Sequence, residues 1–222
     1  MVTRLKTRQR IISTSLELFN QLGERTVSTN HIAAHMEISP GNLYYHFPNK
    51  QAIISELFNE FDALMLGFLC PPAGRLPDVN DKREYLKQLL NAIWQYRFLY
   101  RDIEHLLRSD ADLAVRYRHF SRQCLVQGQA VFTGFVQAGI LGMTPQQVES
   151  LTVNAWIILT SWVGFLCATC DCSDQLSEQA IKRGIHQLLV LESGFVTAPY
   201  RCAVDELLNE YYVPLQNTMD VQ

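Results

Sequence analysis

The spacing of apolar residues is the feature that most limits how this chain can fold. Apolar residues recur three and four positions apart, the period of an α-helix, as Ile12, Leu16 and Phe19 do near the start. The sequence contains no sustained alternation of apolar and polar residues, which would predict β-strands, and no Asn-Gly hairpin turn. The sequence therefore predicts an all-α protein.

The size and composition are those of a folded protein with a sizeable core. The chain has 222 residues, of which 48% are hydrophobic, enough for one large or two small domains. Its longest apolar run, at 155–168, is shorter than the about 18 to 20 residues that a membrane span needs, so we expect a buried helix there. The start of the chain lacks the pattern of a secretion signal. We therefore expect a cytoplasmic protein with no membrane contact.

Charge is distributed unevenly along the chain. The formal net charge is −3, but residues 1–50 hold six Lys and Arg against three Glu, together with three His. The remaining residues hold 13 basic and 19 acidic side chains. A basic end on an acidic remainder is expected when only that end of a protein meets nucleic-acid phosphates.

The basic end has the pattern of a helix-turn-helix. A first helix ends near Gly23, where glycine is a common stop signal. A short second helix is predicted at 29–36, with Ser28 or Thr29 as its N-cap. After a turn of three residues a third short helix begins, which completes the motif.

The third helix lies within the sequence ISPGNLYYHFPNK at 38–50. Ser39 is its predicted N-cap, and Pro40 is its first residue, where a missing N–H has no cost. Leu43 and Phe47 lie four apart and would hold this helix against the two before it. Groups that can contact phosphates, base edges or thymine methyls then face outward, namely Gly41, Asn42, Tyr44, Tyr45 and His46. This arrangement indicates a recognition helix for a major groove, and the alternative is a solvated surface helix with ordinary tyrosines.

The rest of the chain predicts further helices. A helix begins at Lys50, after the N-cap Asn49, and a loop rich in Pro and Gly follows at 70–81. Thr144 and Gln147 have the spacing of a capping box. We expect helices at about 82–96, 98–108, 110–138, 145–170, 174–191 and 202–212. On this reading, the chain divides into a helix-turn-helix domain at 1–50 and a larger helical domain at 51–222.

Two runs of this sequence, RIISTSLELFNQLG and TNHIAAHMEISPGNLYYHFPNK, resemble the TetR/AcrR family of bacterial transcriptional regulators. The resemblance is strongest over residues 8–58, about a quarter of the chain, and the predicted helix order agrees with it. One departure is Glu37, in the turn where the family commonly has Gly. A positive φ angle is easy for Gly but strained for Glu.

The resemblance implies a role in DNA binding for nine residues. Phosphate contacts are implied for Thr29, Ser39, Tyr45, His46 and Lys50, and base contacts for Pro40, Gly41, Asn42 and Tyr44. Lys50 would hold a phosphate at the start of its helix, where its own charge and the helix N-terminus both favour an anion.

The resemblance also implies that the domain at 51–222 binds a ligand and forms a homodimer on a near-palindromic double-stranded DNA operator. Its pocket would take a small apolar or amphipathic effector, with the candidates Phe61, Trp94, Phe98, Tyr117, Phe120 and Trp156. The dimer would form through two long helices near the C-terminus, with the candidates Trp162, Phe165, Ile185, Leu188 and Leu189. Core packing within one chain is the alternative for each residue of both sets.

Two other functions remain as alternatives. The sequence CATCDC places Cys167, Cys170 and Cys172 close together, which leaves a thiol- or metal-responsive regulator open, although no second Cys/His pair completes a metal site. A helical enzyme is the less favoured alternative, because no catalytic motif is found. We therefore predict a DNA-binding regulator, a ligand-responsive repressor with no cofactor and no metal, while activation in place of repression stays open.

Overall fold

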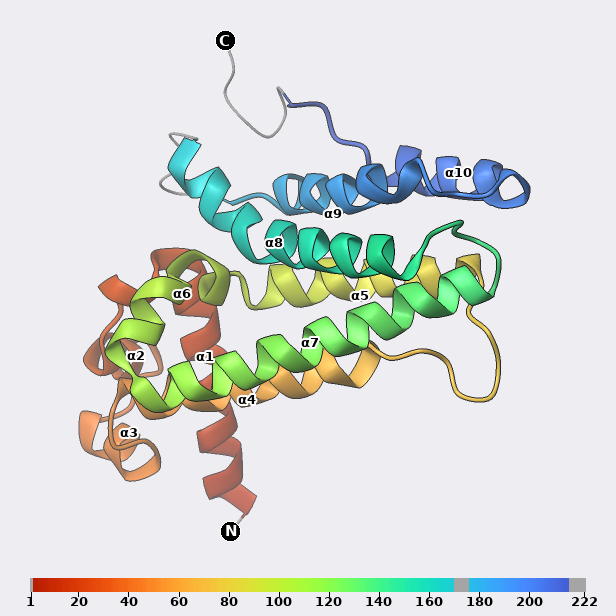
Figure 1. Ribbon diagram of the computed structural model, residues 1–222. Helices are drawn as coiled ribbons and strands as arrows, with labels where there is room; N and C mark the ends of the chain where they lie inside the picture. The colour runs from red at the N-terminus through yellow and green to blue at the C-terminus, as the bar shows by residue number, and fades with distance from the viewer. Residues whose placement is uncertain (1, 170–175, 216–222) are drawn as a thin grey trace.

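A computed structural model describes residues 2–169 and 176–215 of the chain (Figure 1). The described residues form α-helices, two 3₁₀ turns and one isolated bridge between Leu141 and Val196, with no β-strand, which confirms the predicted all-α class. The elements are α1 (Val2–Leu22), η1 (Glu24–Thr26), α2 (Thr29–His35), α3 (Pro40–His46), α4 (Lys50–Phe68), α5 (Val79–Gln95), α6 (Arg97–Ser109), α7 (Ala111–Gln137), α8 (Pro145–Thr169), α9 (Glu178–Ser193), η2 (Ala198–Tyr200) and α10 (Arg201–Tyr211).

Side-chain caps explain where several helices begin. Thr144 and Gln147 form the predicted capping box before α8: the Thr144 amide donates to the Gln147 side chain at 2.8 Å, and the Gln147 amide donates to the Thr144 hydroxyl at 3.3 Å. At α4, the Asn49 side chain accepts from the Ala52 amide at 2.8 Å, as predicted. These interactions are local in sequence, so the predicted starts of α4 and α8 agree with the structure, whereas α5 begins at Val79 and α9 at Glu178, three residues before and four residues after their predicted starts.

The helices form a small head and a larger layered body (Figure 1). Helices α1, α2 and α3 make up the head, at the left of the view. In the body, α4 packs beside α7, α8 packs against α7 and α9, and α10 packs on α9. Helix α5 contacts α4, α9 and α10. In Figure 1, α4 and α7 both run away from the head, α5 and α8 run back toward it, and α4 lies on the lower side of the body.

The head and the body share one hydrophobic core, and α6 joins them at the end of α1. Asn20 donates from its amide to the Gln95 carbonyl at 2.8 Å and accepts from the Phe98 amide at 3.1 Å. The rings of Phe19 and Phe98 pack with centroids 5.3 Å apart. The core continues from α1 through α4 into the body, so the packing shows no boundary at residue 50. The domain division there stays a prediction.

The turn between α2 and α3 contains the strain suspected from the sequence. Glu37 has a φ angle of 56°, and it is the one non-glycine residue with a positive φ angle among the described residues. The backbone still closes the turn, because the Glu37 amide donates to Ala34 and the Ile38 amide donates to Ala33. Glu37 is exposed, so its side chain gains no buried contact that would offset the strain.

We expect the substitution Glu37→Gly to raise the free energy of unfolding by about 1 kcal/mol, since glycine adopts positive φ angles without strain. Urea unfolding followed by circular dichroism measures this change. Glu17→Gly, in the middle of α1, is the control and should lower the free energy of unfolding by about 1 kcal/mol. A loss of stability in Glu37→Gly would contradict the strained turn.

Candidate functional site

Helix α3 presents a polar and aromatic face to solvent. Its two anchors are buried as predicted, with Leu43 at 0% and Phe47 at 2% exposure, whereas Tyr44 and Tyr45 are 47% and 64% exposed. The Ser39 hydroxyl accepts from the Asn42 amide at 3.2 Å and so caps the helix at its predicted start. The short helix is thus held from one side only.

The other predicted DNA-binding residues lie around this face. Pro40, Gly41 and Asn42 are exposed, and a Cβ atom at Gly41 would have no neighbour closer than the Ser39 hydroxyl at 4.0 Å. Thr29, at the start of α2, shares a hydrogen bond of 3.0 Å with the Tyr44 hydroxyl. The structure therefore brings the ends of α2 and α3 together with the outer face of α3. His46 is half-buried, and its ring lies at a steep angle to that of Tyr45, with the ring centroids 5.3 Å apart.

Lys50 has a different environment from the one predicted. Its ammonium nitrogen lies 2.6 Å from the Glu24 carboxylate and donates to the backbone carbonyls of Glu24 and Val27 at 2.9 and 3.1 Å. Two of the three N–H donors of the ammonium group therefore meet backbone carbonyls, and the carboxylate lies at ion-pairing distance. In this structure, Lys50 ties the start of α4 to η1, and its contact with a phosphate stays a prediction.

Glu24 is the acceptor that makes this arrangement costly to disturb. Its side chain is only 4% exposed, and one of its oxygens lies 3.8 Å from His105 on α6. A buried carboxylate needs a positive partner, because it has lost most of its hydration. The η1 turn thus connects the helix after α3 with the first part of the body. Sequence spacing gave no sign of it, since Lys50 and Glu24 lie 26 positions apart.

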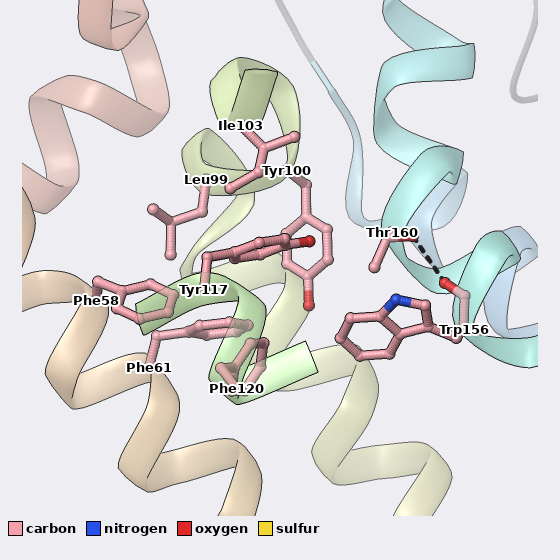
Figure 2. Close-up of a pocket in the computed structure, with 9 residues that line it drawn as sticks. All are labelled: Phe58, Phe61, Leu99, Tyr100, Ile103, Tyr117, Phe120, Trp156 and Thr160. Carbon is pink, nitrogen blue, oxygen red and sulfur yellow. Dashed lines mark hydrogen bonds between the residues drawn. The ribbon is translucent and has the colours of Figure 1, made fainter. Parts of the chain in front are cut away.

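An aromatic cavity lies where α4, α6, α7 and α8 meet (Figure 2), and the space between its lining residues, open solvent included, is about 330 Å³. Figure 2 shows Trp156 on α8 facing a group of rings that includes Phe61, Tyr117 and Phe120. These four predicted ligand residues do line one cavity. Tyr100, which is not among the predicted ligand residues, also lines this cavity, and burial raises the pKa of its hydroxyl.

Two of the predicted ligand residues line neither this cavity nor the larger one described next. Phe98 is fully buried against Phe19 at the junction of head and body, and the Trp94 ring stacks under the Arg97 guanidinium at 4.0 Å. Their assignment to a ligand pocket stays a prediction. Core packing is the alternative to a ligand contact for an aromatic residue at a helical core position, and the two are distinguished only in the folded structure.

A second, larger cavity is also lined by Trp156, and the space between its lining residues, open solvent included, is about 770 Å³. Its wall is mainly apolar and comes from α4, α5, α7, α8 and α9. Two charged side chains line it: Lys82 on α5 and Glu192 on α9, whose nitrogen and oxygen atoms lie 2.5 Å apart. Sequence reasoning singled out neither residue, because they lie 110 positions apart.

The predicted dimerisation residues divide into buried and exposed ones. Ile185 and Leu189 are fully buried within one chain, and Leu188 is nearly so. Trp162 donates from its indole nitrogen to the Ala180 carbonyl at 2.7 Å, and its ring lies over Gly184, where a Cβ atom would come within 2.5 Å of it. Trp162 thus packs α8 against α9 within one chain, and the assignment of the set to a dimer surface stays a prediction. Phe165 is exposed.

The cysteine cluster falls partly outside the described residues. Cys167 is exposed near the end of α8, whereas Cys170 and Cys172 lie beyond the described part of the chain. Among the residues that the structure does describe, no group of three or more His, Cys, Asp or Glu side chains is placed to hold a metal ion. By length and composition alone, α8 could cross a membrane, which is weak evidence for a span.

A head with an exposed recognition helix, joined to a helical body with internal cavities, defines the class of helix-turn-helix regulators with a separate regulatory body. Residues 11–57 match the family described as "Bacterial regulatory proteins, tetR family", and residues 60–204 match the one described as "Bacterial transcriptional repressor". The chain therefore belongs to the TetR family of bacterial transcriptional regulators. Proteins of this family are transcriptional regulators, not enzymes.

Individual proteins agree with this assignment. A solved TetR-family transcriptional regulator from Marinobacter aquaeolei VT8 is 40% identical, with a TM-score of 0.85 over 93% of this chain and 99% of that one. The regulator UidR of Escherichia coli K12 is 39% identical over 51 residues, which are 23% of this chain and 26% of UidR. The probable acrEF/envCD operon repressor of the same strain is 41% identical over 56 residues, or 25% and 24% of the two chains. The matches to these two curated relatives thus span only about a quarter of their length.

Proposed function

We propose that this TetR-family protein is a ligand-responsive repressor that binds a near-palindromic operator as a homodimer. The observation that carries the proposal is the geometry of α3, in which Leu43 and Phe47 are buried while Tyr44 and Tyr45 face solvent. A helix held from one side with donors on the other is suited to a major groove. The proposed base contacts are Pro40, Gly41, Asn42 and Tyr44, and the proposed phosphate contacts are Thr29, Ser39, Tyr45 and His46.

The homodimer is proposed from the surface of α8 and α9. Only 28% of the most apolar window of α8 is buried within the chain. The exposed large apolar side chains on these two helices are Val153, Ile157, Phe165 and Val190. A group of exposed large apolar side chains on neighbouring helices marks a surface that a partner covers. A second copy of the same surface would form a four-helix interface with two-fold symmetry.

The ligand response is proposed from the position of α4. Phe58 and Phe61 of this helix line the aromatic cavity, and Met65 and Leu69 line the larger one. The same helix begins directly after α3 and is tied to the head by Lys50. A ligand that fits one arrangement of α4 better than another would shift the spacing of the two recognition helices in a dimer. Ligand and operator would then weaken each other's binding.

Selection of bound fragments from the genome of the source organism with the purified full-length protein tests the proposal. We expect the recovered fragments to share an inverted repeat whose half-sites lie one helical turn, about 10 base pairs, or a multiple of it apart. Footprinting of one fragment should protect both half-sites. Recovery of fragments without a common sequence, or protection of a single half-site, would reject a dimeric repressor of this kind.

The role of Tyr45 can be tested by removing one oxygen atom. We expect Tyr45→Phe to weaken operator binding about tenfold, since a hydrogen bond to a charged phosphate is worth roughly 1.5 kcal/mol. Fluorescence anisotropy with labelled operator measures this affinity. The salt dependence should stay unchanged, because Tyr45 releases no counterion. Tyr212→Phe, at another exposed tyrosine, is the control. Equal affinities of Tyr45→Phe and the unaltered protein would remove Tyr45 from the interface.

A further inference from the structure

The buried Lys82–Glu192 pair is the unusual feature of the larger cavity. The two side chains are 5% and 4% exposed, and they link α5 to α9 across an otherwise mainly apolar wall. Removing two charges from water is costly, and well-packed apolar residues in place of a buried ion pair often stabilise a protein as well or better. Stability alone therefore does not account for a pair placed on the surface of a cavity.

The pair retains hydrogen-bonding capacity toward the cavity. The Lys82 ammonium has three N–H donors. One meets the Glu192 carboxylate at 2.5 Å, and the Phe135 ring lies 4.6 Å from the nitrogen. Glu192 in turn has accepting oxygen lone pairs beyond the single bond to Lys82. A ligand group in the cavity would thus find a donor and an acceptor side by side.

The Tyr85 and Thr152 hydroxyls and the Cys124 thiol, which also line the cavity, offer a ligand weaker hydrogen bonding than the ion pair does. The Tyr85 and Thr152 hydroxyls donate to backbone carbonyls, those of Cys70 and Val148. Burial raises the pKa of the Tyr85 hydroxyl to about 12 and that of the Cys124 thiol also to about 12, so both groups stay uncharged at neutral pH. The Lys82–Glu192 pair is therefore the strongest polar anchor among the residues that line this cavity.

We propose that this cavity binds an uncharged, mostly apolar molecule whose single hydroxyl-type group bonds to both Lys82 and Glu192. The pair has no net charge, so an anionic or cationic ligand would bring an uncompensated charge into an apolar space, which is costly. A hydroxyl group can accept from Lys82 and donate to Glu192 at once. This inference rests on the proposed ligand response, and it specifies the class of ligand that would produce that response.

The test uses three probes that share one ring system: naphthol, naphthoate and naphthylmethylammonium. Isothermal titration of the full-length protein at neutral pH should show naphthol binding at least tenfold more tightly than either charged probe. In the variant Lys82→Met/Glu192→Met, naphthol should bind at least tenfold more weakly. The matched control is Arg83→Met/Glu210→Met, which removes an exposed ion pair between α5 and α10, and it should leave all three affinities unchanged.

Several results would overturn the inference. Naphthoate or naphthylmethylammonium binding as tightly as naphthol would reject an uncharged ligand, and this comparison needs no variant to fold. Unchanged naphthol affinity in the double variant would mean that the pair only links α5 to α9, and absence of naphthol binding would also reject the proposal. Operator binding by the unliganded protein is measured in parallel. If the unliganded protein does not bind operator, the proposed repressor function is rejected. The class of ligand is then still decided by the naphthol titration.

Discussion

The substitution Lys50→Met is expected to lower the free energy of unfolding by about 3 kcal/mol, the size expected when one partner of a buried ion pair is removed. Without the ammonium group, the Glu24 carboxylate stays buried at 4% exposure with no positive partner at hydrogen-bonding distance. Two backbone carbonyls of the η1 turn, those of Glu24 and Val27, also lose their donor. Urea unfolding measured by circular dichroism would report the loss.

Two further variants separate this role from a phosphate contact. In Lys50→Met/Glu24→Gln the buried charge is gone, so part of the stability should return, and operator affinity should stay near that of the unaltered protein. Arg83→Met, which breaks the exposed pair with Glu210, should cost at most about 1 kcal/mol. If Lys50→Met is as stable as the unaltered protein but binds operator poorly, the ammonium contacts phosphate after all.

The substitution Ile157→Lys is expected to separate the proposed dimer and to weaken operator binding at least about a hundredfold. Ile157 is 53% exposed in the single chain, in the middle of the apolar face of α8. A lysine there would meet its own copy or other apolar groups across a two-fold interface, where an unpaired charge is costly. Loss of the second recognition helix removes the gain from bivalent binding, which is about 10² to 10⁴.

Sedimentation velocity would measure the subunit mass, and anisotropy would measure the operator affinity of the same sample. Val126→Lys places the same charge at an exposed apolar position on α7 and should leave both quantities unchanged. Ile157→Lys that still sediments as a dimer would exclude this face of α8 as the interface. A monomer with full operator affinity would instead reject the need for a dimer.

Local patterns were enough to predict most of the fold and the position of α3. Ser39, Asn49 and Thr144 cap their helices through hydrogen bonds to amides three residues further along the chain. Such caps can therefore be predicted from a short stretch of sequence. The four-residue spacing of Leu43 and Phe47 likewise identifies the buried side of α3, and the face opposite follows from it. Roles in DNA contact are not tested by these observations and remain proposals.

Contacts between distant segments could not be predicted in the same way. Periodicity identified the apolar sides of α8 and α9, but Ile185 and Leu189 turned out to face the interior of their own chain. An apolar stripe on a helix indicates that the stripe is covered, but it does not indicate whether the same chain, a second copy or a ligand covers it. The same reason explains Trp94 and Phe98, which were assigned to a ligand cavity and lie outside both cavities described.

The sequence by itself determined the helical class, most of the helix ends and the outward face of the recognition helix, because each depends on residues within a few positions of one another. Only the tertiary structure decided what Lys50 holds and that Lys82 meets Glu192, since these partners are 26 and 110 positions apart in the chain. The role of a charged side chain depends on the nearest opposite charge and on how far water is excluded around it. Both are set only when the chain has folded.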